Sequence, residues 1–531
     1  MTDLAAAAAE NINREPLKWW REKPVWVMLF LGFSAGIPIL LIFGTLSLWL
    51  REAGVSRSTA TFFSWAILGY SFKFLWAPLV DNLPIPLLTK LLGRRRSWIL
   101  VSQFLVIGSI VLMALTDPQS GLIAMAIAAV CLGFASATQD IVIDAYRIES
   151  AQPRLQAMLA TTYISGYRVG MIMAGAIALS LAEGFGSTAE TYSYLAWQKT
   201  YLIMAAVMLV GVVTTLLIKE PEVDATRSGY RNRDYLSFIA VFALSIASFV
   251  LVLWGSPSTP EMFQGGTQVF FKFVFSSLFL VLAIVCAYGV AILCARAGLI
   301  NQSMVNEAYK EPVLDFFKRY GKLAVWVLLL ILFYRISDIV LGVIANVFYQ
   351  DMGYSKTQIG AMSKAFGLIV SIIGSFLSGV IALRYGVLRT LQGGAVFVVA
   401  TNLLFLWLTS VGQNHTNLVF DLPLLGQFGF PLELAVVITF DNLAQGFSTV
   451  AFIAWMSSLT NVSFTATQYA IFSSIMTLFP KIIGGYSGTL VDNFGYSNFF
   501  LFASALGVPV IFLIHFLRNK LELNNAPSAT R

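Results

Sequence analysis

Two aspartates lie one helical turn apart in an otherwise apolar part of this sequence. Asp140 and Asp144 follow residues 121–132, which carry no charge. A carboxylate well inside a membrane helix costs several kcal/mol unless it is paired, solvated or protonated. Their i, i+4 spacing places both on one face of a helix. That face must look into protein or water, never into lipid, and a transport pathway is the first hypothesis.

Further charged residues fall within apolar stretches, and each of them is expensive in a bilayer. The expected intramembrane cations are Lys73, Arg168, Arg335, Lys364 and Lys481, and the expected carboxylates are Asp140, Asp144, Asp338 and Asp441. The slight surplus of cations suits a substrate that carries carboxylates or phosphates, or a titrating carboxylate beside fixed cations. The alternative is a set of ion pairs that hold helices in register.

Spacing also predicts local partners. Arg335 and Asp338 are three residues apart, share a helix face and can pair. Asp441 shares another face with Gln445. On the next helix along the chain, Arg168 lies within reach of Asp140 or Asp144.

These residues must be positioned by membrane helices. The chain has 531 residues, of which 58% are hydrophobic and 11% charged, with a mean hydropathy of +0.77. Apolar runs of about 20 residues recur along it, long enough for helices and too uniform for barrel strands. We expect about fourteen transmembrane helices in an all-α membrane protein. They lie near 25–50, 58–80, 97–115, 120–145, 160–182, 199–218, 235–254, 269–296, 323–349, 357–383, 388–410, 431–459, 467–491 and 497–517.

The net charge of +7 has a distribution that argues against nucleic-acid binding. Arginine and lysine cluster in alternate loops, as the positive-inside rule expects of cytoplasmic segments. The loops on the other side carry only Arg51, Arg57, Lys199, Lys272 and Lys356. Both termini are therefore expected in the cytoplasm. The bilayer is the expected partner. The chain is expected to act as a monomer.

Metal and cofactor chemistry is not expected, and neither is enzyme activity. The cysteines, Cys131, Cys286 and Cys294, all fall in apolar runs without disulfide or metal spacing. The two histidines, His415 and His515, have no ligand partner nearby in the sequence.

Polar segments divide the chain into six, two and six helices. The expected parts are a cytoplasmic tail at 1–24, a six-helix bundle at 25–218, a linker at 219–234, two additional central helices at 235–296, a linker with an interfacial helix at 297–322, a second six-helix bundle at 323–518 and a tail at 519–531. A shift of 313 residues pairs Gly133-Phe134 with Gly446-Phe447, and Arg168 with Lys481. A parallel duplication of six helices resembles the plan of major facilitator transporters, which bind substrate near the midplane between the halves.

The loop after the second span resembles the G-x-x-x-D-x-x-G-R-[RK] motif of those transporters. Asp81 ends the span, and Arg94 and Arg95 follow Gly93. The motif implies that an acid at one helix end pairs with basic residues to latch the cytoplasmic side. Ala77 stands in place of the first glycine, and the loop of the second half lacks the aspartate. The expected gate residues are Asp81, Arg94, Arg95 and Asp144.

The first span contains a second kind of signal. Gly32 and Gly36 form a small-xxx-small surface for close helix contact, and Pro38 removes a backbone hydrogen bond. Gly36 and Pro38 are expected to form a hinge for alternating access, with a static kink as the alternative.

Several motifs together resemble AmpG-type muropeptide permeases. They are FKFLWAPLVD at 72–81, GRRRSW at 93–98, ATQDIVIDA at 137–145, GYRVG at 166–170, YRISD at 334–338 and FTATQY at 464–469. The resemblance implies a multi-pass inner-membrane permease of Gram-negative bacteria. Such permeases import N-acetylglucosaminyl-1,6-anhydro-N-acetylmuramyl peptides by proton symport for peptidoglycan recycling, and they feed the signal that induces β-lactamase. Gln139, Asp140 and Arg168 fall in the region of that family that is critical for transport.

The site follows from both lines of reasoning. The expected substrate-binding residues are Lys73, Gln139, Arg168, Arg335, Lys364, Asn442, Gln445 and Lys481, and the expected proton-coupling residues are Asp140, Asp338 and Asp441. Trp65, Trp76 and Trp455 could stack on sugars, although such tryptophans also serve as interfacial anchors. Asp144 lies about 6 Å nearer the cytoplasm than Asp140 by helical rise. It is expected to pair with Arg147, Arg154 or Arg168.

Two alternatives stay open. Acetyl-CoA importers are sequence relatives, and their anionic cargo would suit the same cations. A membrane signalling protein that transports nothing is the other, although it would not need several charges at the midplane.

Overall fold

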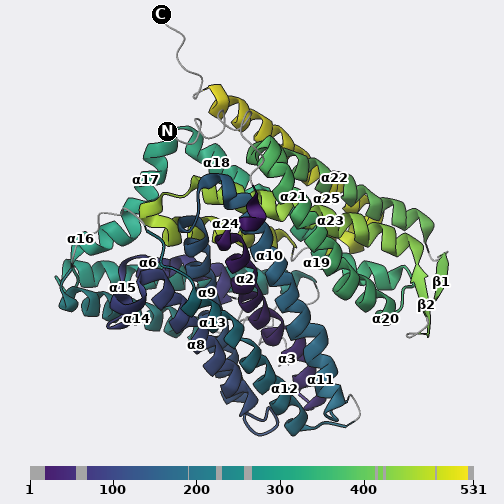
Figure 1. Ribbon diagram of the computed structural model, residues 1–531, viewed down its shortest axis with the longest axis horizontal. Coiled ribbons are helices and arrows are strands. Elements are labelled where there is room, and N and C mark those ends of the chain that lie inside the picture. The colour runs from purple at the N-terminus through teal and green to yellow at the C-terminus, as the bar shows by residue number, and fades with distance from the viewer. Residues whose placement is uncertain are drawn as a thin grey trace, which may run out of the picture. The chain divides into compact units, whose positions relative to one another are not determined.

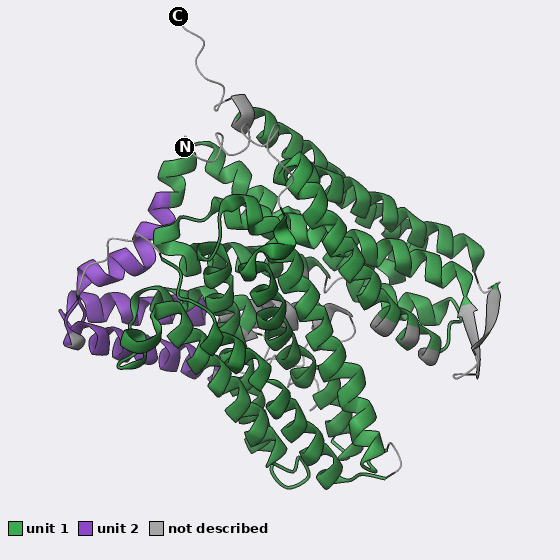
Figure 2. Cartoon of the chain, in the orientation of Figure 1, with its two compact units in different colours: residues 1–224, 316–531 green, residues 225–315 purple. Residues whose placement is uncertain are grey.

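The computed structural model describes residues 18–55, 68–188, 191–222, 230–255, 266–412, 416–422, 426–484 and 487–523. The chain forms two compact units, shown in Figure 2. Unit 1 comprises Met1–Asp224 and Phe316–Arg531, and unit 2 comprises Ala225–Asp315. The expected tail up to residue 17, and with it Arg57, Trp65 and His415, lies outside the described residues.

The first half of unit 1 is built from helices (Figure 1). They are η2 (Trp19–Arg21), α2 (Lys23–Ile42), α3 (Gly44–Glu52), α5 (Leu68–Phe72), η4 (Lys73–Leu75), α6 (Ala77–Asn82), α7 (Leu88–Leu92), α8 (Arg94–Ala114), α9 (Leu122–Glu149), η5 (Pro153–Leu155), α10 (Gln156–Ile172), η6 (Met173–Ile177), α11 (Ala178–Gly184), α12 (Tyr194–Val207) and α13 (Leu209–Leu217).

The second half of unit 1 repeats this helical plan and adds one hairpin. Its elements are α18 (Leu323–Phe333), α19 (Ile336–Asp351), α20 (Lys356–Ile359), η8 (Gly360–Phe366), α21 (Gly367–Tyr385), α22 (Val387–Val411), β1 (Asn417–Leu422), β2 (Gly426–Pro431), α23 (Leu432–Leu459), η9 (Val462–Phe464), α24 (Thr465–Gly484) and α25 (Ser487–Leu523). The two strands pair antiparallel, with Asn417 opposite Pro431. The sequence did not predict this hairpin, which leaves the fold class unchanged.

Unit 2 contains α14 (Asn232–Trp254), α15 (Gly266–Arg296), α16 (Gln302–Val305) and η7 (Asn306–Lys310). The helix α17 (Glu311–Tyr320) begins in this unit and ends in unit 1. The two additional helices expected at 235–296 are thus α14 and α15.

Eleven helices within the described residues are long and apolar enough to cross a membrane. The described parts of the three other expected spans also fall on helices. The span at 58–80 ends in α5, η4 and α6, the span at 269–296 coincides with α15, and the span at 467–491 coincides with α24 and the start of α25. Helices are the natural solution, because lipid offers no hydrogen-bond partner to a bare backbone.

Close helix contacts in unit 1 depend on glycines. A Cβ atom built on Gly32 of α2 would lie 2.1 Å from the carbonyl oxygen of Tyr163 in α10. A Cβ atom on Gly166 of α10 would lie 1.9 Å from the carbonyl oxygen of Leu29. The small-xxx-small contact predicted for the first span is therefore confirmed, and Gly36 belongs to it because its Cβ would lie 2.1 Å from the Tyr167 carbonyl oxygen.

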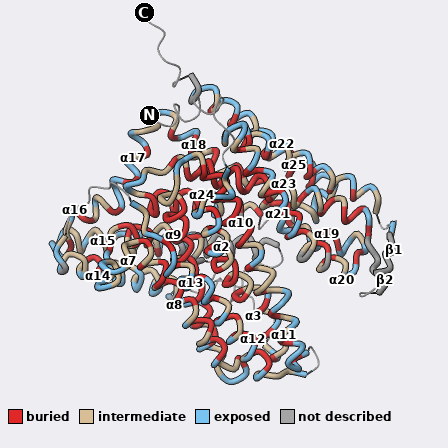
Figure 3. Tube along the Cα trace, in the orientation of Figure 1, coloured by how far each residue is buried: buried red, intermediate tan, exposed pale blue. Residues whose placement is uncertain are grey.

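Buried residues line the facing sides of the helices, and exposed residues lie along their outer sides (Figure 3). Many of the exposed residues are large and apolar, such as Ile123 and Leu217, which are 80% and 79% exposed. Such continuous apolar surface is what a bilayer requires. The costly polar side chains are instead collected inside unit 1.

Candidate functional site

Lys73 lies between the two aspartates that opened the sequence analysis. Its backbone belongs to η4, a 3-10 turn that interrupts the second span between α5 and α6, just before Pro78 in the first turn of α6. The Lys73 Nζ atom lies 3.8 Å from Asp144 Oδ2 and also interacts electrostatically with Asp140. All three charged side chains are buried. The prediction that both aspartates face protein is therefore confirmed.

The two aspartates have different partners. The Tyr163 hydroxyl lies 3.4 Å from Asp140 Oδ1 and donates a hydrogen bond to it. Asp144 accepts a hydrogen bond from Arg147 Nη2 at 3.2 Å, one helical turn further along α9. Among the partners expected for Asp144, Arg147 is thus the one observed.

The second half of unit 1 holds a separate cluster. Arg335 Nε donates to Asp338 Oδ2 at 2.9 Å, and Arg335 Nη1 donates to Thr449 Oγ1 at 2.9 Å. Gln445 Nε2 donates to Asp441 Oδ2 at 3.0 Å. Both local pairs predicted from spacing are confirmed.

Arg168 has a different environment from the one expected. Within the described residues it forms no ion pair with Asp140 or Asp144, and its Nη1 atom lies 3.9 Å from the Met171 sulfur. Its guanidinium interacts electrostatically with Arg335 and Asp338 of the other half. The predicted contact with the aspartates of α9 is wrong, because Asp144 is paired with Lys73 and Arg147 instead, and Tyr163 is the donor to Asp140.

Some expected binding residues are placed elsewhere. Gln139 is fully buried, and its Nε2 atom donates to Ser34 Oγ at 2.8 Å within the first bundle. Asn442 Nδ2 donates to the carbonyl oxygen of Ile438 in its own helix, at 3.0 Å. Lys364 belongs to η8 and Lys481 to α24, and their side chains lie outside the described part of the structure.

The tryptophans do not offer open faces to a sugar. Trp76 is buried, donates to Thr138 Oγ1 at 3.1 Å and lies 5.1 Å from the ring of Phe134. Trp455 is buried beside Phe452. The expected stacking role of these two residues does not fit this arrangement.

Asp81 makes a contact between the halves at what we call the arginine-rich end, the end of unit 1 that carries Arg94, Arg95 and Arg147. Asp81 Oδ2 accepts hydrogen bonds from the backbone N–H and the hydroxyl of Thr467, both at 2.7 Å. Because Thr467 lies in the first turn of α24, the carboxylate satisfies a free N–H group and the positive end of the helix dipole.

Arg95 holds Asp81 in place. The fully buried guanidinium of Arg95 lies 2.8 Å from Asp81 Oδ1 and 2.5 Å from Glu149 Oε1. Arg94 contributes more weakly, at 3.5 Å from Glu149 and 3.9 Å from Asp81. Glu149 and Thr467 were not singled out from the sequence, although Thr467 belongs to a motif that carried the family resemblance.

Glu220 organises the start of α8 at the same end. Its carboxylate accepts hydrogen bonds from the backbone N–H groups of Arg95 and Arg96, at 2.7 and 3.0 Å. Burial raises the pKa of the Glu220 carboxyl above its ordinary value. Glu220 lies in the segment read as a linker, where a long-range cap has no sequence signal.

Comparisons with known proteins show which transporters this chain resembles. Residues 25–220 match a family model described as acetyl-coenzyme A transporter 1, and residues 327–530 match the major facilitator superfamily. The putative transporter AmpG 4 of Rickettsia conorii is 28% identical over 506 residues, covering 95% of this chain and 99% of that protein. The anhydromuropeptide permease of Escherichia coli is 28% identical over 498 residues, covering 93% and 80%. The chain is thus similar to AmpG-type permeases over most of its length.

Solved structures agree on the fold. The proton:xylose symporter XylE matches with a TM-score of 0.58 at 12% identity, covering 93% of this chain and 94% of that one. The transporter FucP in its outward conformation also matches with a TM-score of 0.58 at 12% identity, covering 93% and 98%. The chain is therefore a multi-pass membrane protein with the major facilitator fold, as the sequence predicted.

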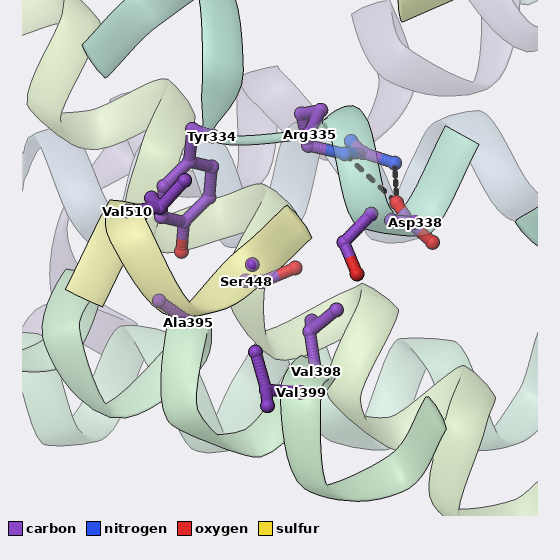
Figure 4. A pocket seen from close by; sticks show the side chains of 10 residues that line it. Tyr334, Arg335, Asp338, Ala395, Val398, Val399, Ser448 and Val510 are labelled. Carbon is purple, nitrogen blue, oxygen red and sulfur yellow. Dashed lines mark hydrogen bonds and ion pairs between the residues drawn. The ribbon is translucent and has the colours of Figure 1, made fainter. Parts of the chain in front are cut away.

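The described residues of unit 1 line a small cavity and a larger groove. Figure 4 shows Arg335 and Asp338 pointing toward each other beside a small cavity that Tyr334 and Ser448 also line. That cavity has room for roughly one water molecule. A groove of about 1180 Å³ at the arginine-rich end is lined by α2, the end of α9 and α13, including Trp26 and Val213. Neither hollow contains Lys73 or Arg168.

Proposed function

We propose that this protein imports N-acetylglucosaminyl-1,6-anhydro-N-acetylmuramyl peptides across the bacterial inner membrane by proton symport and alternating access. The observation that carries the proposal is the electrostatic interaction between two cations of opposite halves, Arg168 and Arg335. Arg335 has Asp338 as a partner, whereas Arg168 forms no ion pair with a described carboxylate. An anionic cargo held between the halves would neutralise such a costly cation.

The cargo fits this charge. A muropeptide carries several peptide carboxylates and a polar sugar rim, and anhydromuropeptide permease is the printed name of an Escherichia coli relative. Import of such molecules would return cell-wall fragments for peptidoglycan recycling and would feed the signal that induces β-lactamase, with consequences for β-lactam resistance. Lys73, which belongs to the first half, is a third cation beside Arg168 and Arg335.

Proton coupling is best assigned to Asp140 and Asp441. Asp140 accepts a hydrogen bond from the Tyr163 hydroxyl and Asp441 accepts one from Gln445, and both of these donors are neutral groups. Asp338 differs from these two aspartates because it is bonded directly to the cation Arg335. A carboxylate without a bonded cation is the easier one to protonate inside a membrane.

The arginine-rich end is proposed to face the cytoplasm, because positively charged loops stay on that side. Asp81, Arg95 and Thr467 would then close the cytoplasmic side, with Arg94 and Asp144 assisting, and cargo would enter from the periplasm. Gly36 and Pro38 stay candidates for a hinge. A monomer suffices for this cycle, because both halves of the site belong to one chain.

Uptake into proteoliposomes tests the proposal. Purified protein is reconstituted, an inward proton gradient is imposed, and radiolabelled anhydromuropeptide inside the vesicles is counted. Accumulation that disappears when a protonophore is added supports the proposal. An absence of uptake in vesicles whose protein is correctly folded and oriented would overturn it.

A second cargo is favoured by one observation. The first half matches the acetyl-coenzyme A transporter family model over residues 25–220. Acetyl-CoA is also an anion and would suit Lys73 and Arg168. Labelled acetyl-CoA is therefore the second substrate in the same vesicles, and uptake of acetyl-CoA alone would replace the muropeptide assignment while leaving the cationic path intact.

A further inference from the structure

We propose that Arg147 is the positioning residue through which the charged site of the first half controls closure of the arginine-rich end. The inference rests on the proposed function, because it gives the bound anion a route to the gate. Arg147 lies in the last turn of α9 and is fully buried. A buried guanidinium is retained only when several partners compensate it, so the identity of those partners shows what it does.

Two of the partners of Arg147 belong to the opposite half. Its Nη1 atom donates to Ser457 Oγ in α23 at 2.8 Å. Its guanidinium carbon lies 5.2 Å from the centre of the Tyr469 ring in α24, within the range of a cation–π interaction. One side chain of the first half thus holds two helices of the second half.

The third partner of Arg147 leads back to the site. Arg147 Nη2 donates to Asp144 Oδ1, and Asp144 Oδ2 lies 3.8 Å from Lys73 Nζ. Lys73 in turn interacts with Asp140. The four groups form a row of alternating charge, Asp140, Lys73, Asp144 and Arg147, which ends on the opposite half.

A charge that approaches Lys73 therefore changes the electrostatic interactions of Arg147 at the other end of the row. An anionic group of the cargo that approaches Lys73 competes with Asp144 for its ammonium group. Asp144 then depends on Arg147 alone and draws the guanidinium toward itself. A hydrogen bond of 2.8 Å to Ser457 is lost after a shift of roughly 1 Å, because side-chain hydrogen bonds do not extend past about 3.5 Å.

The Asp81 contact is a second link between the halves at the same end. Asp81 bonds to Arg95 and to the start of α24. Arg147 differs in being bonded to Asp144, which belongs to the charged row of the first half.

Distance measurements between spin labels at Gln152 and Val462 test the inference. Both positions are exposed and lie at the arginine-rich end, one on each half, and Cys131, Cys286 and Cys294 are first replaced by serine or alanine. Without cargo, Arg147→Gln is expected to raise the population with separated labels about tenfold, because hydrogen bonds to a charged group are lost. The control is Arg518→Gln, whose partner Gln392 lies in its own half. The control is expected to match the wild type.

A second variant guards against misfolding caused by the unpaired Asp144. Ser457→Ala combined with Tyr469→Leu removes both contacts from the opposite side and leaves every buried charge in place. It is expected to separate the labels in the same direction as Arg147→Gln. A wild-type distance distribution in both variants would overturn the inference.

Cargo addition completes the test. Saturating anhydromuropeptide is expected to shift the label distances in the wild type and to cause at most about a tenth of that shift in Arg147→Gln. An equal shift in both proteins would overturn the proposed route. The cargo-free measurements do not depend on which cargo is carried, so a failure of anhydromuropeptide uptake would overturn the proposed function alone.

Discussion

The two halves of unit 1 meet at two junctions that are built from different chemistry. At the first, α24 receives the carboxylate of Asp81 and the guanidinium of Arg147 from the first half. At the second, α10 meets α21 through small and neutral groups, with Thr161 Oγ1 donating to the Ser375 carbonyl oxygen at 3.1 Å. The shift of 313 residues makes α10 and α24 equivalent helices of the repeat, so equivalent positions have diverged.

This difference suits two roles: the charged junction at α24 would act as a latch, and the α10–α21 junction would act as a pivot. Charged contacts respond to a bound anion or a proton, because their strength depends on every neighbouring charge. Contacts of small residues depend on shape and persist when charges change. We infer that the charged junction opens during the cycle and that the α10–α21 junction stays packed while the halves rotate.

The repeat shows the divergence at single positions. The shift of 313 residues pairs Asp144 of α9 with Ser457 of α23. The two equivalent positions hold the same arginine, Arg147, from opposite sides. By contrast, the cluster of Arg335, Asp338 and Thr449 is bonded within its own half.

The largest effect on the charged junction is expected from a substitution of Asp81. Asp81→Ala removes the acceptor of two Thr467 hydrogen bonds and leaves the buried Arg95 with fewer partners, a change that costs about 3–5 kcal/mol when a buried pair is broken. We expect the arginine-rich end to open and transport to fall at least about 100-fold. Spin-label distances and vesicle uptake measure both effects.

The control for Asp81 is Asp117→Ala, which removes a carboxylate bonded to the Tyr192 hydroxyl at 2.8 Å. Asp117 makes no contact across the junction in the described structure, so closure is expected to be unchanged. Equal label distances in the two variants would contradict the latch.

The role of Arg168 in cargo binding can be tested by substitution. Arg168→Gln removes the cation that interacts with Arg335, and the apparent affinity for anhydromuropeptide is expected to fall about tenfold or more, as for a lost charged hydrogen bond. Arg518→Gln, whose partner is Gln392 near the chain end, is the matched control. An unchanged KM in Arg168→Gln would remove that residue from the cargo site.

The pivot is tested at Gly379. A Cβ atom there would lie 2.2 Å from Thr161 Oγ1 and 2.8 Å from the Met158 sulfur, so Gly379→Ala is expected to lower the free energy of unfolding by about 1–3 kcal/mol. Gly393→Ala meets nothing within 4 Å and is the control. Thermal unfolding in detergent measures both, and a Tm for Gly379→Ala equal to that of the control would argue against tight packing.

The smallest effect is expected at Thr161. Thr161→Val removes one neutral hydrogen bond to the opposite half, worth about 0.5–1.5 kcal/mol. Label distances at the arginine-rich end should stay unchanged, because the pivot does not set closure. An opening as large as that of Asp81→Ala would erase the distinction between the junctions.

Much of the fold could be predicted from the sequence because lipid imposes a simple rule of apolar length. The pairs Arg335–Asp338 and Asp441–Gln445 were also predictable, since their partners lie within one helical turn. The partners of Arg147 and Asp81 in the second half were not. Ser457 and Thr467 are ordinary neutral residues, and only the tertiary arrangement makes the hydroxyl of one and the backbone N–H of the other into ligands for a charge.

The prediction of the partners of Arg168 was wrong for a related reason. Its position on the helix after Asp140 suggested a partner nearby in the sequence, whereas its guanidinium interacts electrostatically with Arg335 and Asp338 on the other half. Gln139 was read with its neighbour Asp140, but adjacent residues on a helix point about 100° apart, and Gln139 turns into the bundle toward Ser34.

The most direct test of proton-coupled transport compares accumulation with exchange in Asp140→Asn vesicles. The substitution keeps the size of the side chain and an acceptor for the Tyr163 hydroxyl. We predict that gradient-driven accumulation of anhydromuropeptide is lost while exchange of labelled for unlabelled substrate continues, because exchange needs alternating access without net proton movement. Full accumulation by Asp140→Asn would contradict the account and remove Asp140 from the proton path.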